Sequence, residues 1–408
     1  MIAALDRLLP NQAAIEYVQL QNLREARKFF GPLSDAERNW RSQHSFGPLI
    51  ASPRAKLGIG EHDRGEAYMF GGHGYPFGDQ ASLDRHFPLN VKVVTASELV
   101  IGDEQVCDFS ATREEFPWEV PIADELYLKM VVNRLTFGTN SSLTVKGNVF
   151  VLNCENLTGS HPSSPHSLNI KLLDNGQPVA RRRFEALIPI EQRHGKNGAP
   201  GVDAGPPHYE NTPFGPKVVV DIHRPAPSPG GDGEDGKNGR NGDNGGMLYL
   251  ADLRFKSINC ETGSVTVSAK AGTGFPGGAG GQGGQGGAGG NGTQGLQSNG
   301  QIVGATPGGR GGCGGDGGVG GRGGNGGMAS HVYLSIPQEY SNRFIFNLQA
   351  SAGGRGGVGG VGGMGGQGGS PASTQTMIGS DGKNGSSGEH GKPRAAPRAI
   401  IFENSSQT

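Results

Sequence analysis

Residues 277–292 read Gly-Gly-Ala-Gly-Gly-Gln-Gly-Gly-Gln-Gly-Gly-Ala-Gly-Gly-Asn-Gly, so that glycine returns with a strict period of three. The same period occurs in five other blocks of the chain. Two further blocks are of this dense Gly-Gly-x type, Gly308–Gly327 and Gly353–Gly369. Three are of the sparse Gly-x-x type: Gly195–Gly201, Gly233–Gly245 and Gly379–Gly391.

A period of three matches neither the α-helix, which repeats at about 3.6 residues, nor the strand, which repeats at 2. It is typical of the left-handed polyproline-II type of helix, which has three residues per turn and no internal hydrogen bonds. Each row of glycines would then be a smooth strip along which another backbone can approach and exchange hydrogen bonds. A dense block offers two strips and a sparse block one, so we expect the dense blocks at the centre of a bundle and the sparse ones at its edges.

Two other interpretations of the glycine period fit less well. A collagen triple helix requires long, uninterrupted Gly-X-Y with abundant proline, whereas these blocks are short and almost free of proline. A flexible glycine-rich linker has no reason to keep register or to be interrupted by alternating apolar segments. We therefore expect a six-helix polyglycine-II bundle.

The segments between the blocks predict a topology. Residues 247–255 and 264–270 form one expected β pair, and residues 328–336 and 343–350 form a second, 81 positions later. A truncated third copy, 399–403, ends the repeat. The remaining connections, 204–229, 293–307 and 370–378, are expected to be loops at the opposite end, which gives a rod about 50 Å long with a base and a tip.

The rest of the chain predicts two further regions. Alternating apolar residues between Phe87 and Ile190 predict an all-β domain of many short strands, in the range 87–194. Residues 1–86 are interpreted as a helical and irregular attachment region, with a helix capped by Asn11 that carries Ile15 and Val18. The rod occupies 195–408. The predicted fold class is thus mostly β, with a small α region, an all-β middle domain and the polyglycine-II bundle.

Composition narrows the possible functions. The 408 residues carry a net charge of −1, and lysine, arginine, aspartate and glutamate are interspersed, which favours neither nucleic acid nor an anionic membrane as a partner. The sequence shows no Sec-type signal peptide and no membrane-spanning stretch. Cys107, Cys154, Cys260 and Cys313 lack zinc-site spacing and are expected to be free thiols. We expect an extracellular or particle-associated protein after non-Sec release, or otherwise a cytoplasmic one.

Few residues suggest chemistry. His208-Tyr-Glu210 and Asp221-Ile-His223 could chelate a cation, but no regular spacing enforces it. Matches to Gly-x-Gly-x-x-Gly arise freely in a Gly-Gly-x tract, and no hydrolase, metalloprotease or kinase signature is present. The polar residues between Lys237 and Asn244 are interpreted as a solvated face. We therefore expect no enzyme activity, no cofactor and no resident metal.

The arrangement of glycine blocks and loops over 195–391 resembles the receptor-binding adhesins at the tips of the long tail fibres of T-even-like phages, and more weakly the antifreeze protein of snow fleas. The adhesin resemblance implies an N-terminal attachment domain, which could dock onto a larger particle or fibre, and variable loops that recognise a receptor at the distal end. A bacterial surface or secreted adhesin remains an open alternative. The antifreeze resemblance implies ice binding, and a collagen-like structural role is a further alternative.

The loops at the predicted tip supply the candidate binding residues, because loops on a rigid scaffold are the usual place for recognition. Aromatic and apolar groups ringed by amides suit a cell-surface protein or a glycan. Alternatively, the same apolar groups only cap the ends of the rod. The candidates are His208, Tyr209, Phe214, His223, Leu296, Gln297, Ile302, Gln375, Met377 and Ile378.

Overall fold

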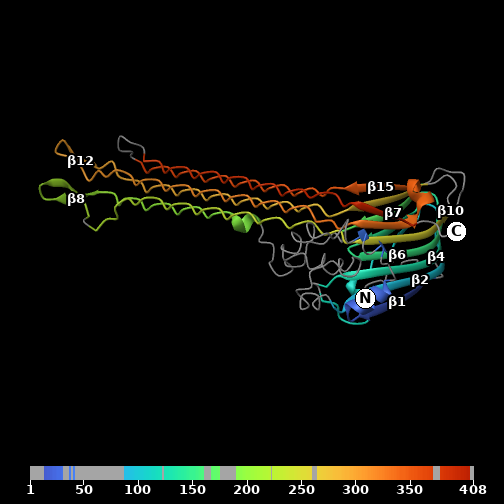
Figure 1. Cartoon of the computed structure of the whole chain (residues 1–408). Coiled ribbons are helices and arrows are strands. Elements are labelled where there is room, and N and C mark those ends of the chain that lie inside the picture. The colour runs from blue at the N-terminus through green and yellow to red at the C-terminus, as the bar shows by residue number, and fades with distance from the viewer. Residues whose placement is uncertain are drawn as a thin grey trace.

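A β body built from two sheets forms one end of the molecule, and a long glycine-rich rod extends from it (Figure 1). The computed structural model describes residues 13–30, 36–37, 40–41, 87–121, 124–159, 167–174, 190–221, 223–259, 264–370 and 377–404. The predicted irregular stretch 44–82 lies outside these residues.

The larger sheet has seven strands in the order β1-β2-β4-β6-β10-β14-β16. Every neighbouring pair is parallel except β1 and β2, which are antiparallel. The strands are β1 (Ala14–Leu20), β2 (Leu89–Ile101), β4 (Leu126–Phe137), β6 (Val149–Gly159), β10 (Ala251–Asn259), β14 (Val332–Pro337) and β16 (Ala399–Asn404).

The smaller sheet has five strands, all parallel, in the order β15-β11-β7-β5-β3. They are β3 (Val106–Asp108), β5 (Ser142–Lys146), β7 (Ser167–Leu173), β11 (Ser264–Lys270) and β15 (Phe344–Gln349). Leaving aside the short hairpin strands, the chain alternates between the two sheets from β2 onward. Each strand of the larger sheet is thus followed by a strand of the smaller one, up to β16.

The core lies between the two sheets. It is built from rows of apolar side chains that occupy the same register on neighbouring strands. Val94, Met130, Leu152, Leu253 and Leu334 occupy successive strands at the same register, and each is fully buried. Because similar residues stack at the same register, each pair of successive strands covers the apolar surface of the pair before it, as expected for a repeat architecture.

The glycine blocks are crossovers of this β body. We number them glycine segments 1 to 6: 195–201, 233–245, 277–292, 308–327, 353–369 and 379–391. Segments 1, 3 and 5 follow strands of the smaller sheet and lead away from the body, and segments 2, 4 and 6 return to strands of the larger sheet. Parallel strands require a long connection, and here the rod supplies it.

The predicted fold class is therefore wrong. The regular structure is two parallel-rich sheets with few helices, and no polyglycine-II bundle is evident in the described residues, where the glycine segments are neither helix nor strand. The larger sheet contains strands from all three predicted regions, because β1, β6 and β10 align in it. The expected β pairs are also wrong, since β10 and β11 lie in different sheets and each pairs with parallel neighbours instead.

The N-terminal helix prediction needs a similar correction. Residues Ala14–Leu20 form the edge strand β1, and the helix α1 (Leu23–Phe29) begins only after it, with Asn22 as its cap. The Asn22 side chain accepts the Glu25 backbone N–H at 3.0 Å. The apolar residues Ile15 and Val18 belong to the strand, because pairing with β2 satisfies the backbone of this stretch as well as a helix would.

Backbone hydrogen bonds hold the glycine segments side by side. The Gly283 N–H donates to the Val361 carbonyl at 2.9 Å, and the Gly315 N–H donates to the Gly284 carbonyl at 2.8 Å. Segments 3 and 4 each exchange such bonds with four other segments, whereas segments 1 and 6 do so with two. A Cβ atom on Gly283 would lie 2.0 Å from the Gly315 carbonyl oxygen, so no other residue fits there.

Asparagine and aspartate side chains close the edges of the rod, which corrects the interpretation of residues 237–244 as a merely solvated face. The residue before each glycine of segment 2 accepts a backbone N–H from segment 4 at 2.6–2.9 Å. Such caps satisfy donors that would otherwise be open to pairing with another chain. The acceptors are Asp232, Asp235, Asn238, Asn241 and Asn244.

Candidate binding site at the rod tip

Two short hairpins lie at the end of the rod farthest from the β body, where β8 and β12 are labelled in Figure 1. The first joins β8 (His208–Thr212) to β9 (Gly215–Val219) and connects glycine segments 1 and 2. The second joins β12 (Leu296–Ser298) to β13 (Gln301–Val303) and connects segments 3 and 4.

The first hairpin presents an aromatic residue at its apex. The Phe214 N–H donates to the Thr212 hydroxyl at 3.3 Å, and that hydroxyl donates to the Gly215 carbonyl at 2.7 Å. Gly215 has φ +110°, a conformation that favours glycine. The turn directs Phe214 away from the protein, and its side chain is fully exposed, at 102%.

The second hairpin turns through Asn299 and Gly300, which have φ of 51° and 77°. Positive φ at both central residues is the signature of the type I′ turn, for which Asn-Gly is the preferred pair. Ile302, on the strand after the turn, is 68% exposed. Gln297, its cross-strand partner, is exposed too, and Leu296 is half-buried.

Polar contacts join the two hairpins into one unit. The Tyr209 hydroxyl of the first hairpin donates to the Gln297 carbonyl of the second at 3.0 Å. The Arg224 guanidinium donates to the carbonyls of Gly205 and Gly304 at 3.2 and 3.1 Å, which ties the base of one loop to the base of the other. Because these bonds link separate loops, the two hairpins keep a fixed relative position.

Of the third predicted tip loop, 370–378, the structure describes only Ser370, Met377 and Ile378. Met377 and Ile378 are 49% and 47% exposed at the start of glycine segment 6, and the Met377 carbonyl accepts the Gly311 N–H at 2.9 Å. Gln375 lies outside the described residues. Met377 and Ile378 therefore belong to the side of the rod near its tip, and no contact with the hairpins is shown for them.

The candidate histidines do not form a metal site. His208 and His223 are exposed, and the backbone N–H of His223 donates to the Asp221 carboxylate at 2.8 Å. No cluster of three or more histidine, cysteine, aspartate or glutamate side chains suited to a metal occurs in the part of the chain that the structure describes.

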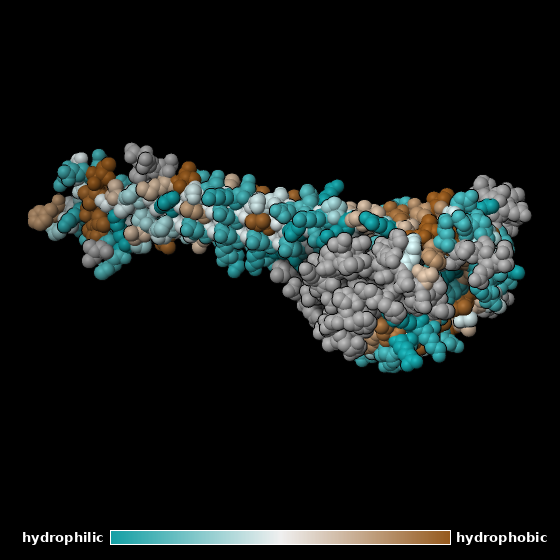
Figure 2. Space-filling view, in the orientation of Figure 1, coloured by the Kyte–Doolittle hydropathy of each residue, from teal (hydrophilic) through white to brown (hydrophobic). Residues whose placement is uncertain are grey.

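Apolar side chains are concentrated at the tip surface. Figure 2 shows hydrophobic residues gathered around the distal end, beside hydrophilic residues that dominate the middle of the rod. Phe214, Ile302 and Tyr209 are the large exposed members on the hairpins. Val218, which pairs with Tyr209 across the first hairpin, is instead buried at 7%, so part of the apolar set forms a small core and part remains available.

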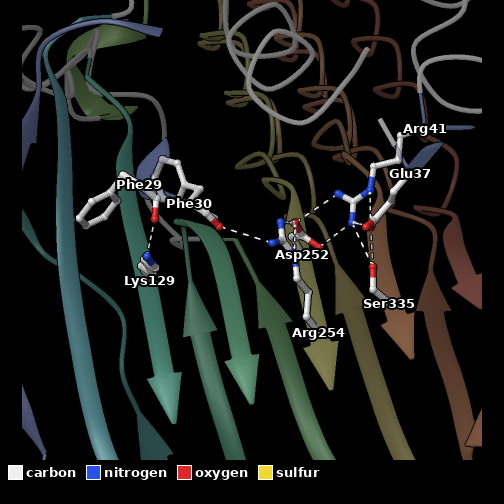
Figure 3. A network of polar contacts seen from close by, with 8 residues as sticks. All are labelled: Phe29, Phe30, Glu37, Arg41, Lys129, Asp252, Arg254 and Ser335. Atoms are coloured by element: carbon white, nitrogen blue, oxygen red, sulfur yellow. Dashed lines mark hydrogen bonds and ion pairs between the residues drawn. The ribbon is translucent and has the colours of Figure 1, made fainter. Parts of the chain in front are cut away.

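A second polar cluster lies at the other end, where the N-terminal region contacts the larger sheet (Figure 3). The Arg41 guanidinium, 1% exposed, contacts Glu37 at 2.6 Å and Asp252 at 2.9 Å. The Asp252 carboxylate is fully buried and also binds Arg254 at 2.5 Å. Ser335 donates to Glu37 at 2.7 Å, so the network joins Glu37 and Arg41 to β10 and β14.

The charges of this network support one another. Burial alone would raise the pKa of the Asp252 carboxyl, but the guanidiniums of Arg41 and Arg254 hold it well below its usual range. Burial would likewise lower the pKa of Arg41, and Asp252 and Glu37 raise it instead. The described part of the N-terminal region is therefore fastened to its own β body.

The sequence predicted Tyr209, Phe214 and Ile302 for the tip loops, where their side chains are exposed, but it gave no indication of the groups that position them. Arg224 and Thr293 have no local signal, since their partners are backbone carbonyls and a hydroxyl that lie between 11 and 80 positions away in the sequence. Arg41 and Asp252 are 211 positions apart, and nothing in either neighbourhood links them. The edge caps did have a signal, because asparagine or aspartate precedes successive glycines of segment 2.

Comparison with protein-family models, with curated proteins and with solved structures finds no match for this chain. Within the described residues, no helix has the length and apolar character needed to span a membrane.

Proposed function

We propose that the protein is a non-enzymatic binding protein that recognises a cell-surface protein or glycan through the two hairpins at the rod tip. The observation that carries the proposal is the group of large side chains exposed on cross-tied hairpins at the end most distant from the β body: Phe214, Ile302 and Tyr209.

The rigidity of the tip supports this function. Loops that must order on binding lose side-chain and backbone freedom, which weakens affinity. Here the Tyr209–Gln297 and Arg224–Gly304 hydrogen bonds fix the hairpins before any ligand arrives. The rod itself, with backbone bonds along its length, holds the hairpins away from the bulk of the body.

The chemistry of the exposed groups supports it too. Aromatic residues supply much of the energy at protein interfaces, and they do so from a setting of amides and hydroxyls. Phe214 and Tyr209 have such a setting in Thr212 and Gln297. If the hairpins only capped the ends of the rod, their large apolar side chains would be buried. Val218 is buried in this way, but Phe214 is fully exposed.

The N-terminal region would then link the protein to a larger particle or fibre. The support is positional: β1, Glu37 and Arg41 lie on the β body, at the opposite end from the hairpins (Figure 1). The ligand contacts and the attachment would thus be separated by the length of the rod.

The test compares Phe214→Ser and Ile302→Ser, singly and together, with Val319→Ser as a matched control. Val319 is an exposed valine on the side of the rod, at 42%, so its replacement removes apolar surface without touching the tip. Binding would be measured to a panel of whole bacterial cells and to immobilised glycans, with ice recrystallisation measured in parallel.

We expect the double tip variant to bind at least about 30-fold more weakly than the parent, in line with loss of an interface anchor of about 2 kcal/mol or more. The control should bind as the parent does. Equal binding by the folded double variant and the parent would contradict the proposal. Ice activity that responds to the rod side and not to the tip would favour the ice-binding alternative.

A further inference from the structure

One side of the rod has a central stretch whose own side chains carry no charge, bordered by Arg193 at the Ala279 carbonyl and by Asp381 at the Gly365 N–H. The x residues of glycine segment 3 and those of segment 5 form two adjacent rows, because Gly283 of segment 3 donates its N–H to the Val361 carbonyl of segment 5. Between Ala279 and Ala288 and between Val358 and Gln367 these rows contain no charge. We call them the uncharged face: Ala279, Gln282, Gln285, Ala288, Val358, Val361, Met364 and Gln367.

The apolar members of this face are well exposed. Val358, Val361 and Met364 are 65%, 59% and 64% exposed, although they are three successive x residues of one segment. The other side of the rod differs, since it carries Arg322 and Glu389 as an ion pair at 3.9 Å. A row of exposed apolar side chains on a flat, uncharged surface indicates an interaction surface.

The segment 3 row has the same order of residues when read in either direction, and the segment 5 row has an apolar residue on each side of its central valine. Segment 3 presents Ala279, Gln282, Gln285 and Ala288, which reads Ala-Gln-Gln-Ala both ways. Segment 5 presents Val361 at the centre, with Val358 and Met364 on either side, and Arg355 and Gln367 beyond them.

The two rows share one centre. The centre of the first row lies at Gly283–Gly284, between Gln282 and Gln285, and the Gly283 N–H bonds to Val361, the centre of the second row, at 2.9 Å. Consider a two-fold axis that passes through this point, lies in the face and is perpendicular to the rod. This single axis places each row of one copy opposite the same row of a second copy, in the reverse direction.

We propose that the uncharged face joins two copies of this chain into an antiparallel dimer about that axis. Each row then meets the same row of the partner in reverse, as an isologous interface requires. Amide faces amide where Gln282 meets the partner's Gln285, and apolar meets apolar where Val358 meets the partner's Met364. Val361 meets itself on the axis. A parallel dimer would instead place the Gln row against the Val-Met row.

The area is that of a small interface. An extended chain spans at most about 3.3–3.6 Å per residue, so the row from Val358 to Gln367 is at most roughly 33 Å long. Two rows with their flanks are roughly 15 Å wide, which gives at most about 500 Å² per copy and about 1,000 Å² in total, the size of a weak, reversible contact. The proposal is independent of the tip function, although it directs the two tips of a dimer in opposite directions.

The first test measures mass against concentration by light scattering and sedimentation for the full chain, for Val361→Lys and for Val319→Lys. Both positions are exposed x residues, but Val319 lies in segment 4 on the charged side. Two lysines would face each other on the axis in the first variant, so we expect its dimer Kd to rise at least about 100-fold. Val319→Lys should leave the dimer Kd unchanged.

The second test determines the orientation with a short bismaleimide, in chains that also carry Cys313→Ser. Val361→Cys should cross-link to itself. Val358→Cys and Met364→Cys should each fail alone and cross-link when mixed, because they face each other only in the antiparallel arrangement. A parent that remains monomeric at all concentrations, a dimer insensitive to Val361→Lys, or self-cross-linking of Val358→Cys would each overturn the proposal.

Discussion

Replacement of Gly318 by alanine tests the close backbone approach on which the rod depends. A Cβ atom at this position would lie 2.2 Å from the Lys237 carbonyl oxygen and 2.8 Å from the Gly236 oxygen. Ordinary contact begins at 3.4 Å, so glycine segment 2 would have to move by about 3.4 − 2.2 = 1.2 Å. The obstacle is the backbone of segment 2, which cannot rotate away as a side chain would.

The energetic cost follows from the bonds that such a movement breaks. Two hydrogen bonds flank the site, from Gly236 to the Asp316 carbonyl at 2.8 Å and from Gly239 to the Val319 carbonyl at 2.7 Å. Their loss costs about 1–3 kcal/mol together, and residual overpacking costs about 1–3 kcal/mol more. Alanine also restricts the unfolded chain, which offsets about 0.4–1 kcal/mol. We expect a net loss of about 1–6 kcal/mol.

The assay is equilibrium unfolding in urea, followed by circular dichroism, for Gly318→Ala and for Val319→Ala. Val319 is the next residue but is 42% exposed, so its truncation should change the free energy of unfolding by no more than about 0.5 kcal/mol. If the two variants lost the same stability, the packing argument for the glycine rows would be refuted.

Two further predictions concern the β body. Asp252→Asn or Arg41→Met should destabilise the protein by about 3–5 kcal/mol, because either leaves the buried network of Glu37, Arg41, Asp252 and Arg254 with one unbalanced charge. Since the folded-state pKa of Asp252 is depressed, its contribution is fully present above its unfolded pKa of about 3.9 and is lost as the pH falls below that value, which acid titration of the urea midpoint would reveal. Burial raises the pKa of the Cys154 thiol to about 12. At pH 8, maleimide should therefore modify the half-buried Cys313 well before Cys154 in the folded protein, which peptide mass mapping would show. Equal rates of modification would contradict the burial of Cys154.

The sequence predicted the local pattern of this protein better than its pairing. The period-three glycines predicted segments that bond outward, and Gly283 and Gly315 do so. Apolar alternation located β10 and β11 within a few residues. Alternation cannot tell whether two successive strands pair with each other or enter different sheets, because both arrangements bury one face of each strand. That ambiguity is the reason the fold class was wrong.

The candidate site shows the same division. Phe214 and Ile302 could be chosen from the sequence because apolar residues in turn-rich segments stand out against a polar background. Their relative placement depends on Arg224, whose two carbonyl partners lie 19 and 80 positions away in the sequence, the second in the other hairpin loop. No single-sequence rule reaches such contacts, since they are set by the geometry of the crossovers.

The out-and-back course of the rod also has a mechanical meaning. Every glycine segment runs along the same axis, so a pull on the tip is directed along the segments and across the hydrogen bonds that join them (Figure 1). Under such a load the bonds are sheared together and cannot open one after another from an end. The force then passes through three pairs of chain connections into the ends of parallel strands in both sheets. A protein anchored at its β body could therefore resist traction at its tip with a backbone composed mostly of glycine.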